Sequence, residues 1–312
     1  MRIGTRGSAL ALAQANLIAA QLGDAGQVGC EIVPMLTSGD LDVRSPAAAS
    51  DKSRWIAELE DALGSGEIDL AVHSAKDVPG ELADGLALLG APARAAAEDV
   101  LCGAAALDEL GPGARVGTSS VRRLAQLRTV REDLDVVAIR GNVDTRLRKL
   151  AAASPEGNTG EGFDAIVLAR AGLQRLGRES EAGGVLDTAR FVPAPGQGAL
   201  ALEGRADDAR TRAAVQAITD SDTLACLRAE RALARELDAT CHTPLGAYAL
   251  PAGCGCLQLR AWVGLPDGSA WVSDELLGGF YDPDALGRRV AERLRLVGAG
   301  ELLAQAEAMA GT

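Results

Sequence analysis

The chain has 312 residues, of which 47% are hydrophobic and 24% charged, and its net charge is −12. This length and composition are typical of a folded protein with more than one domain. The acidic charge excludes a general polyanion-binding protein, and 3% aromatic residues are too few for a base-stacking surface. No apolar run is long enough to span a membrane. We therefore expect neither a nucleic-acid nor a membrane partner.

The N-terminal stretch has the apolar character of a signal peptide. Gln14 and Asn16 interrupt it, however, and Leu10, Ala13 and Leu17 recur at helical spacing, which favours a helix of the mature fold. Six cysteines in a chain of this size do not imply disulfide bonds. We expect a cytoplasmic protein with reduced thiols.

Strands and helices alternate in the first part of the chain. The apolar pattern predicts strands at 2–5, 29–36 and 68–73, with helices at 8–22 and around 55–63. This β-α-β-α-β order favours a mostly parallel sheet with helices on both faces.

The next part of the chain contains an internal similarity. RVGTSSVRRLAQL at 115–127 resembles RIGTRGSALALAQA at 2–15, and DAIVLAR at 164–170 is a weaker partner of DLAVHSA at 69–75. Two similar α/β units would place two sets of strand ends across a cleft. The alternative is coincidence between common strand-turn-helix patterns.

The second unit continues with strands expected at 135–139 and 164–168 and a helix from about 142. A Pro/Gly-rich crossing and a strand at 192–203 then return the chain to the first unit.

The last third of the chain predicts a small α+β domain. Helices are expected at 207–218 and 221–238, followed by strands within 245–277 and a helical tail from about 282. Four apolar residues share one face of the longer helix: Cys226, Ala229, Leu233 and Leu237.

Charged side chains follow the apolar strand in IDLAVHSAKDVP, residues 68–79. His73, Ser74, Lys76 and Asp77 lie where the strand ends. Because ligands of open α/β sheets bind at the carboxyl ends of strands, these groups are well placed for chemistry. The alternative is a solvated turn with a Lys-Asp pair.

A basic patch lies between residues 115 and 149, where nine basic and four acidic residues give a balance of +5. Ser119 or Ser120 would cap a helix whose first turn contains Arg122 and Arg123, although cations there oppose the helix dipole. Backbone N–H groups, two hydroxyls and two guanidinium groups together form a carboxylate or phosphate site. A solvated helix face is the alternative.

Further arginines follow predicted strand ends. Arg140 follows the strand at 135–139 and precedes Asn142, the expected cap of a helix that leaves Arg146 free to point elsewhere. Arg6 follows the first strand in the matching place. Because arginine binds carboxylates bidentately and stays charged, this arrangement suits a ligand with many carboxylates.

Cys241 lies in the turn LDATCHTPLG, where its thiol is expected to be accessible. His242 is adjacent in sequence, which does not make a catalytic pair. Cys254 and Cys256 could join them in a zinc site, but Cys-x-Cys is a poor match to zinc-ligand spacing, so we expect no metal. A structural cysteine is the ordinary alternative.

Taken together, these stretches resemble the porphobilinogen deaminases, also called hydroxymethylbilane synthases. The similarity runs from Arg2 to near the C-terminus and rests on five motifs in register: VHSAKDVP, VGTSSVRRLAQL, IRGNVDTRL, PAPGQGALALE and ATCHTPLGAYA. It implies an α/β fold of two lobes like those of periplasmic binding proteins, with a cleft between them, and a small C-terminal α+β domain. We expect domain 1 at 1–92 and 192–212, domain 2 at 93–191 and domain 3 at 213–312.

The resemblance also implies an activity. The family's covalent dipyrromethane cofactor, two linked porphobilinogen units, would be attached by a thioether to Cys241. A monomeric transferase would add four porphobilinogens to this primer with loss of ammonia. It would then release hydroxymethylbilane by hydrolysis, for tetrapyrrole and haem biosynthesis.

Residue roles follow from the same resemblance. Ammonia loss leaves a cationic azafulvene, and Asp77 matches the catalytic aspartate that stabilises such charge. His73 would then be structural. The matches to carboxylate-binding and polar cleft residues are Arg6, Ser74, Lys76, Thr118, Ser119, Ser120, Arg122, Arg123, Arg140, Arg146 and Arg175.

One loop departs from the family pattern. The glycine-rich GGKGLF followed by Val-Lys reads here SDKSRW followed by Ile56-Ala57, so Lys52 keeps one lysine as a loop contact and Ala57 lacks the other. Arg54 is a substitute for it, and the loop's role as a lid stays open. Two alternatives to this interpretation are a non-catalytic polycarboxylate-binding protein and a transferase that uses Cys241, as a thiol nucleophile, and His242 directly.

Overall fold

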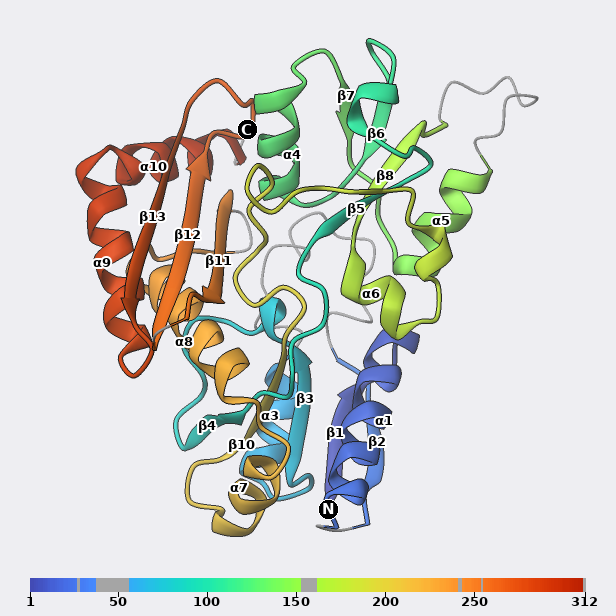
Figure 1. Ribbon diagram of the computed structural model, residues 1–312. Coiled ribbons are helices and arrows are strands. Elements are labelled where there is room, and N and C mark those ends of the chain that lie inside the picture. Colours follow the sequence, from blue (N-terminus) through green and yellow to red (C-terminus); the bar gives the residue numbers. More distant parts are fainter. Residues whose placement is uncertain (27–28, 38–55, 153–161, 241–242, 254, 311–312) are drawn as a thin grey trace.

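The computed structural model describes residues 1–26, 29–37, 56–152, 162–240, 243–253 and 255–310 (Figure 1). These residues form two five-stranded sheets and one three-stranded sheet. The five-stranded sheets each form the centre of a lobe, and the small sheet belongs to a C-terminal domain beside them. No described helix is long and apolar enough to cross a membrane.

The first lobe is built on a sheet with the strand order β2-β1-β3-β10-β4. Its strands are β1 (Arg2–Arg6), β2 (Glu31–Met35), β3 (Leu70–Ser74), β4 (Leu86–Gly90) and β10 (Leu200–Arg205). β1 pairs in parallel with β2 and β3, whereas β10 is antiparallel to β3 and β4. Alternate residues of β3 face opposite ways, so α1 (Ala9–Asp24) and α7 (Ala209–Gln216) pack on one face and α3 (Ala57–Gly64) on the other.

The second lobe has the order β7-β6-β8-β5-β9. Its strands are β5 (Asp99–Cys102), β6 (Arg115–Gly117), β7 (Asp135–Val137), β8 (Ala165–Ala169) and β9 (Gly184–Val185). α4 (Val121–Val130) packs on one face, and α5 (Val143–Ala151) and α6 (Arg170–Arg175) pack on the other. Asn142 caps α5, as the sequence predicted, and of the two candidate caps Ser119 and Ser120 it is Ser120 that caps α4. Two short 3₁₀ helices complete this lobe, η4 (Leu107–Glu109) and η5 (Glu179–Glu181).

The two lobes share one topology. In each, a central parallel trio is extended by an antiparallel strand, β10 in the first lobe and β5 in the second. Both internal similarities fall on equivalent elements, since β1–α1 corresponds to β6–α4 and β3 to β8. The predicted duplication is therefore confirmed at the level of strand order.

Two extended segments, 91–98 and 192–199, join the lobes. They lie side by side, with the Ala95 N–H donating to the Gly198 carbonyl over 3.2 Å. The second segment leads into β10, which enters the first sheet between β3 and β4. The predicted return of the chain to the first unit, by a crossing followed by a strand, is thus correct, and the strand begins at Leu200.

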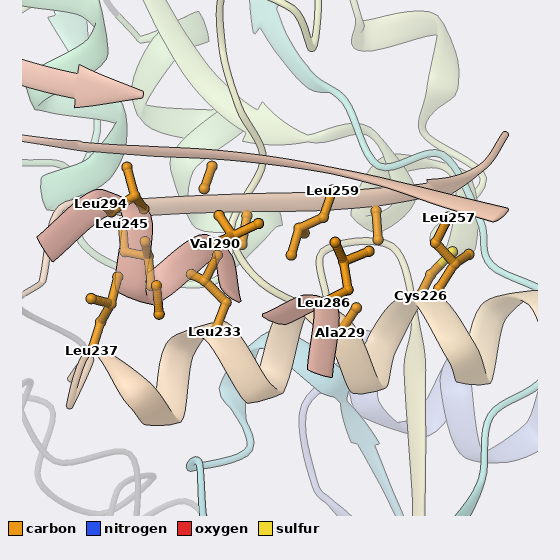
Figure 2. Close-up of a cluster of buried hydrophobic side chains, with 14 of the residues drawn as sticks. Cys226, Ala229, Leu233, Leu237, Leu245, Leu257, Leu259, Leu286, Val290 and Leu294 are labelled. Carbon is orange, nitrogen blue, oxygen red and sulfur yellow. The ribbon is translucent and has the colours of Figure 1, made fainter. Parts of the chain in front are cut away.

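The C-terminal domain packs helices on one face of an antiparallel sheet, as expected for the α+β class. Its elements are β11 (Leu245–Pro251), β12 (Cys256–Gly264), β13 (Trp271–Gly279), α8 (Ser221–Glu236), α9 (Pro283–Leu296) and α10 (Ala299–Ala310). Figure 2 shows Cys226, Ala229, Leu233 and Leu237 meeting apolar side chains of α9 and the sheet. The apolar face predicted for the helix at 221–238, which is α8, is confirmed.

Several short strands were not predicted. β4, β5 and β9 contain five, four and two residues, too few for a clear periodic pattern. β7 ends at Val137, two residues before the predicted end at 139. These strands depend on pairing partners distant in sequence, which local patterns do not report.

Candidate active site

A small cavity of about 100 Å³ lies between the two lobes. Leu10, Gln14, Ser74 and Lys76 line it from the first lobe, and Gly196 and Gly198 from the connecting segment. The second lobe contributes Arg123, Val143, Arg146, Leu168, Ala169, Ala171, Gly172 and Arg175. Four cationic side chains therefore converge on one site in a protein whose net charge is −12.

The first-lobe wall is the end of β3 and the 3₁₀ helix η3 (Ala75–Asp77) that follows it. Lys76 and Asp77 are both half-buried there. Burial and the nearby Arg123 lower the pKa of Lys76 to about 8, and the negative charge of Asp77 opposes this shift. The lysine is thus mostly protonated at neutral pH but close to its titration range.

Gln14 was not predicted as a site residue. Its amide Nε2 donates to Ser74 Oγ over 2.9 Å, and the side chain is 2% exposed. This bond fixes Ser74 at the cavity wall. The sequence contained one indication of this role, because Gln14 is a polar residue on the otherwise apolar face of α1.

Arg122 and Arg123 share the buried carboxylate of Asp99, another residue that was not predicted. Asp99 Oδ2 lies 2.8 Å from Arg122 Nη1, and Asp99 Oδ1 lies 2.7 Å from Arg123 Nη2. Burial alone would raise the pKa of Asp99, but the two guanidinium groups outweigh it and hold the pKa well below its usual range. One carboxylate against two guanidinium groups leaves a net positive charge.

The two arginines differ in what they reach. Arg123 lines the cavity and also donates to the Val167 carbonyl, whereas Arg122 donates to the Val192 carbonyl and is not part of the lining. Gln197 Nε2 donates to Asp99 Oδ1 over 2.9 Å. The connecting segment at 192–199 is thereby attached to the same network.

Arg146 and Arg175 complete the cationic lining. Burial lowers the pKa of each guanidinium to about 10, with Arg123 adding to the effect at Arg146. Arg146 Nε donates to the Gly141 carbonyl and Arg175 Nη2 to the Gly198 carbonyl. Within the described part of the chain, the buried Nε of Arg175 has no hydrogen-bond partner, so it retains a donor for a ligand.

The remaining predicted site residues do not line the cavity. Thr118 is buried and accepts from the Ser120 N–H, and the exposed Ser119 donates to the Ile139 carbonyl. Arg140 is exposed and Arg6 is half-buried. Asp77 is adjacent to Lys76. The predicted residues Lys52 and Cys241 lie outside the described residues, as do Arg54 and His242 from the alternatives.

His73 is paired away from the cavity. Its Nε2 lies 2.9 Å from Glu203 Oε2, and the two side chains are 4% and 1% exposed. Among the described residues, Cys102 and Cys226 are free thiols, and burial raises their pKa to about 11 and about 12. No cluster that could hold a metal ion occurs in the described ranges.

These features define a bilobal α/β protein with a cationic cleft between its lobes, suited to a ligand that carries several carboxylates. Its sequence matches two family models. Residues 1–213 match "Porphobilinogen deaminase, dipyromethane cofactor binding domain", and residues 224–295 match "Porphobilinogen deaminase, C-terminal domain".

Curated relatives agree over nearly the full length. The porphobilinogen deaminase of Brevibacillus brevis is 43% identical over 309 residues, covering 97% of this chain and 96% of the relative. That of Xanthomonas euvesicatoria is 46% identical over 314 residues, covering 98% and 99%. The chain therefore belongs to the porphobilinogen deaminase family.

Solved structures give weaker similarity. A periplasmic substrate-binding protein of an ABC transporter from Coxiella burnetii has a TM-score of 0.38 and 14% identity, covering 70% of this chain and 91% of that one. Immunogenic lipoprotein A from Vibrio vulnificus has a TM-score of 0.41 and 10% identity, covering 72% and 96%. The family assignment does not depend on either.

Proposed function

We propose that this protein is a transferase that condenses four porphobilinogen molecules head to tail, with loss of ammonia, and releases hydroxymethylbilane by hydrolysis for tetrapyrrole and haem biosynthesis. The observation that carries the proposal is the convergence of Lys76, Arg123, Arg146 and Arg175 between the lobes. Each pyrrole unit carries an acetate and a propionate, so a growing chain needs such a cationic wall.

The described residues fit a covalent dipyrromethane cofactor. Its carboxylates suit the cationic lining, and the unpartnered Nε of Arg175 is a donor that such a carboxylate can take up. When bound, the cofactor supplies the terminal pyrrole carbon to which incoming units are joined. By its match to the family motif, Cys241 is the proposed attachment residue, through a thioether.

Carboxylate binding is the proposed role of the cleft arginines. Arg123, Arg146 and Arg175 act from the cavity wall, and Ser74 and Lys76 face them from the first lobe. Arg122 shares Asp99 with Arg123 and adds positive charge behind the wall. Arg6, Arg140, Thr118, Ser119 and Ser120, with Lys52 as a loop contact, complete the proposed set by their match to the family.

Asp77 is the proposed catalytic residue. It follows the carboxyl end of β3 and is adjacent to Lys76, which lines the cavity. A carboxylate beside the substrate's pyrrole N–H stabilises the cation that forms as ammonia leaves, and does so strongly in a site that excludes water. The neighbouring cations would bind the substrate's acid groups and so hold them away from this carboxylate.

We further infer domain boundaries at 1–92 with 192–212, 93–191, and 213–312. The link between β9 and β10 supports the discontinuous first domain, because β10 pairs with β3 and β4. A monomer in the cytoplasm is proposed by family resemblance, with porphobilinogen as its small-molecule partner.

Intact mass spectrometry tests the function and separates its rivals. The protein should carry two extra pyrrole units, absent in Cys241→Ala and retained in the control Cys256→Ala. Asp77→Ala should keep this mass and lose turnover by about 100-fold or more. An unmodified chain in active, freshly made protein would exclude the proposed mechanism, and near-normal turnover of Asp77→Ala would remove Asp77 from its role.

A further inference from the structure

The backbone carbonyls of the loop that follows Asp77 are hydrogen-bonded to an arginine on a helix of another domain. Arg231, on α8 of the C-terminal domain, donates from Nη2 to the carbonyls of Pro79 over 2.8 Å and Gly80 over 3.0 Å. Its Nη1 lies 3.5 Å from the Val78 carbonyl. These three carbonyls belong to the residues directly after Asp77.

The charge of Arg231 is held in an unusual environment. The residue is 9% exposed, and burial lowers the pKa of its guanidinium to about 10, with Arg235 adding to the effect. Within the described residues it forms no ion pair with a carboxylate closer than 4.0 Å, whereas the adjacent Glu230 pairs with Arg94. Burying a guanidinium costs free energy, and here its hydrogen bonds to the backbone carbonyls of residues 78–80 offset part of that cost.

Packing brings the loop and α8 together at the same place. A Cβ atom on Gly80 would lie 2.9 Å from Cγ of Arg235, so any other residue at 80 would have to displace the Arg235 side chain. Val78 packs in one apolar cluster with Leu227 of α8. The residues around Asp77 are therefore fixed from the C-terminal domain as well as from the first lobe.

We propose that Arg231 is a positioning residue for Asp77. It would hold the η3 turn in the orientation that directs the Asp77 carboxylate at the reacting pyrrole. The inference rests on the proposed role of Asp77. It adds that the Asp77 turn and the Cys241 segment are coupled through α8, because this helix ends at Glu236, five residues before Cys241. The helix α8 thus holds the position of the turn that contains the proposed catalytic carboxylate. The segment that contains the proposed cofactor cysteine begins where the same helix ends.

Arg231→Met tests the proposal, since it keeps most of the apolar stem and removes the donors. We expect kcat to fall by about 10- to 100-fold with little change in KM, because a small displacement of a reacting group reduces rate more than binding. Hydrogen exchange should accelerate in the peptide 74–82. The cofactor mass should be retained. Arg228→Met, one turn earlier and paired with Asp284 at the surface, is the matched control.

A rescue experiment separates positioning from general destabilisation. Arg231→Ala leaves a space that guanidinium ions at millimolar concentration can enter, so added guanidinium should restore part of its turnover. It should not restore Arg231→Met, whose side chain fills the space, or Asp77→Ala. If Arg231→Ala does not fold, Arg231→Lys takes its place. Its ammonium group should bond one of the carbonyls, so its kcat should lie between those of wild type and Arg231→Met.

Two results would overturn the proposal: faster exchange in 74–82 with an unchanged kcat, or a lower kcat with unchanged exchange. Failure of the proposed function is recognised separately. In that case wild-type protein lacks the pyrrole mass, or Asp77→Ala turns over normally, while the exchange data still report whether Arg231 holds the loop.

Discussion

Arg94 and Glu230 form a buried ion pair, with 2.6 Å between Nη1 and Oε1, at a point where three parts of the chain meet. Arg94 lies on one connecting segment and Glu230 on α8. The Glu230 carboxylate also accepts from the N–H of Gly196, on the second connecting segment, and from that of Ala249 in β11. This carboxylate therefore joins the C-terminal domain to both connections between the lobes.

Breaking this pair should destabilise the protein strongly. Arg94→Met leaves a fully buried carboxylate without its cation, and we expect a loss of about 3–5 kcal/mol in the free energy of unfolding. Urea denaturation measures it. The control is Arg293→Met, because Arg293 pairs with Asp274 at the surface, where solvent screens the pair and the loss should be much smaller. Equal losses for the two variants would contradict a special role for the buried pair.

The pKa of Lys76 predicts a pH dependence. Because this pKa is lowered to about 8, the lysine loses its charge as pH rises through 8, and carboxylate binding should weaken. We expect kcat/KM for porphobilinogen to fall above about pH 8. Arg stays charged over this range, so Lys76→Arg should lack that part of the decline. The same decline in Lys76→Arg would assign it to another group.

The lowered pKa of Lys76 affects the free energy of unfolding in the opposite direction from kcat/KM. In the unfolded chain Lys76 keeps a pKa near its usual value of about 10.4, so between about pH 8 and 10 the unfolded state binds the extra proton. This one group therefore makes the folded state relatively more stable as pH rises through that window. Comparing urea denaturation of wild type and Lys76→Met at pH 7 and pH 9.5 isolates the contribution.

Asp99→Asn should affect stability and ligand binding in opposite directions. It leaves two buried guanidinium groups without a carboxylate, so the free energy of unfolding should fall by about 3–5 kcal/mol. The positive charge behind the cleft increases at the same time. A polycarboxylate ligand should therefore raise the Tm of Asp99→Asn more than that of wild type. A smaller shift in the variant would show that Asp99 supports the binding geometry more than it limits the charge.

The sequence allowed the Lys76–Asp77 turn and the capped helix with Arg122 and Arg123 to be placed, because each is set by local pattern. The role of Asp99 was not predicted from the sequence, because Asp99 lies more than twenty residues from the two arginines with which it pairs. That pairing requires β5 to enter the second sheet antiparallel to β8, and a four-residue strand has no periodic signal. The interlobe cavity likewise depends on long-range pairing, which brings Gly196 and Gly198 beside β3.

Gly172 offers a test of how closely the lobes approach. It lies in α6 of the second lobe and lines the cavity. A Cβ atom there would lie 3.9 Å from Leu10 of the first lobe and 3.9 Å from Val143, which is ordinary contact distance. Gly172→Ala should therefore fit, and it should raise the free energy of unfolding by about 0.4–1 kcal/mol because alanine loses less conformational freedom in a helix.

Gly172→Leu adds four carbons at the same position, three more than alanine, and these must displace Leu10 or occupy the cavity. Either outcome narrows the space between the lobes or separates them, so we expect kcat/KM to fall by roughly 10-fold or more, the order that misplaced reacting groups produce. Small-angle X-ray scattering distinguishes the two outcomes, because separation raises the radius of gyration and filling does not. Full activity of Gly172→Leu would mean that the working cleft is wider here than the 100 Å³ cavity indicates, and that the lobes already part at this contact when substrate binds.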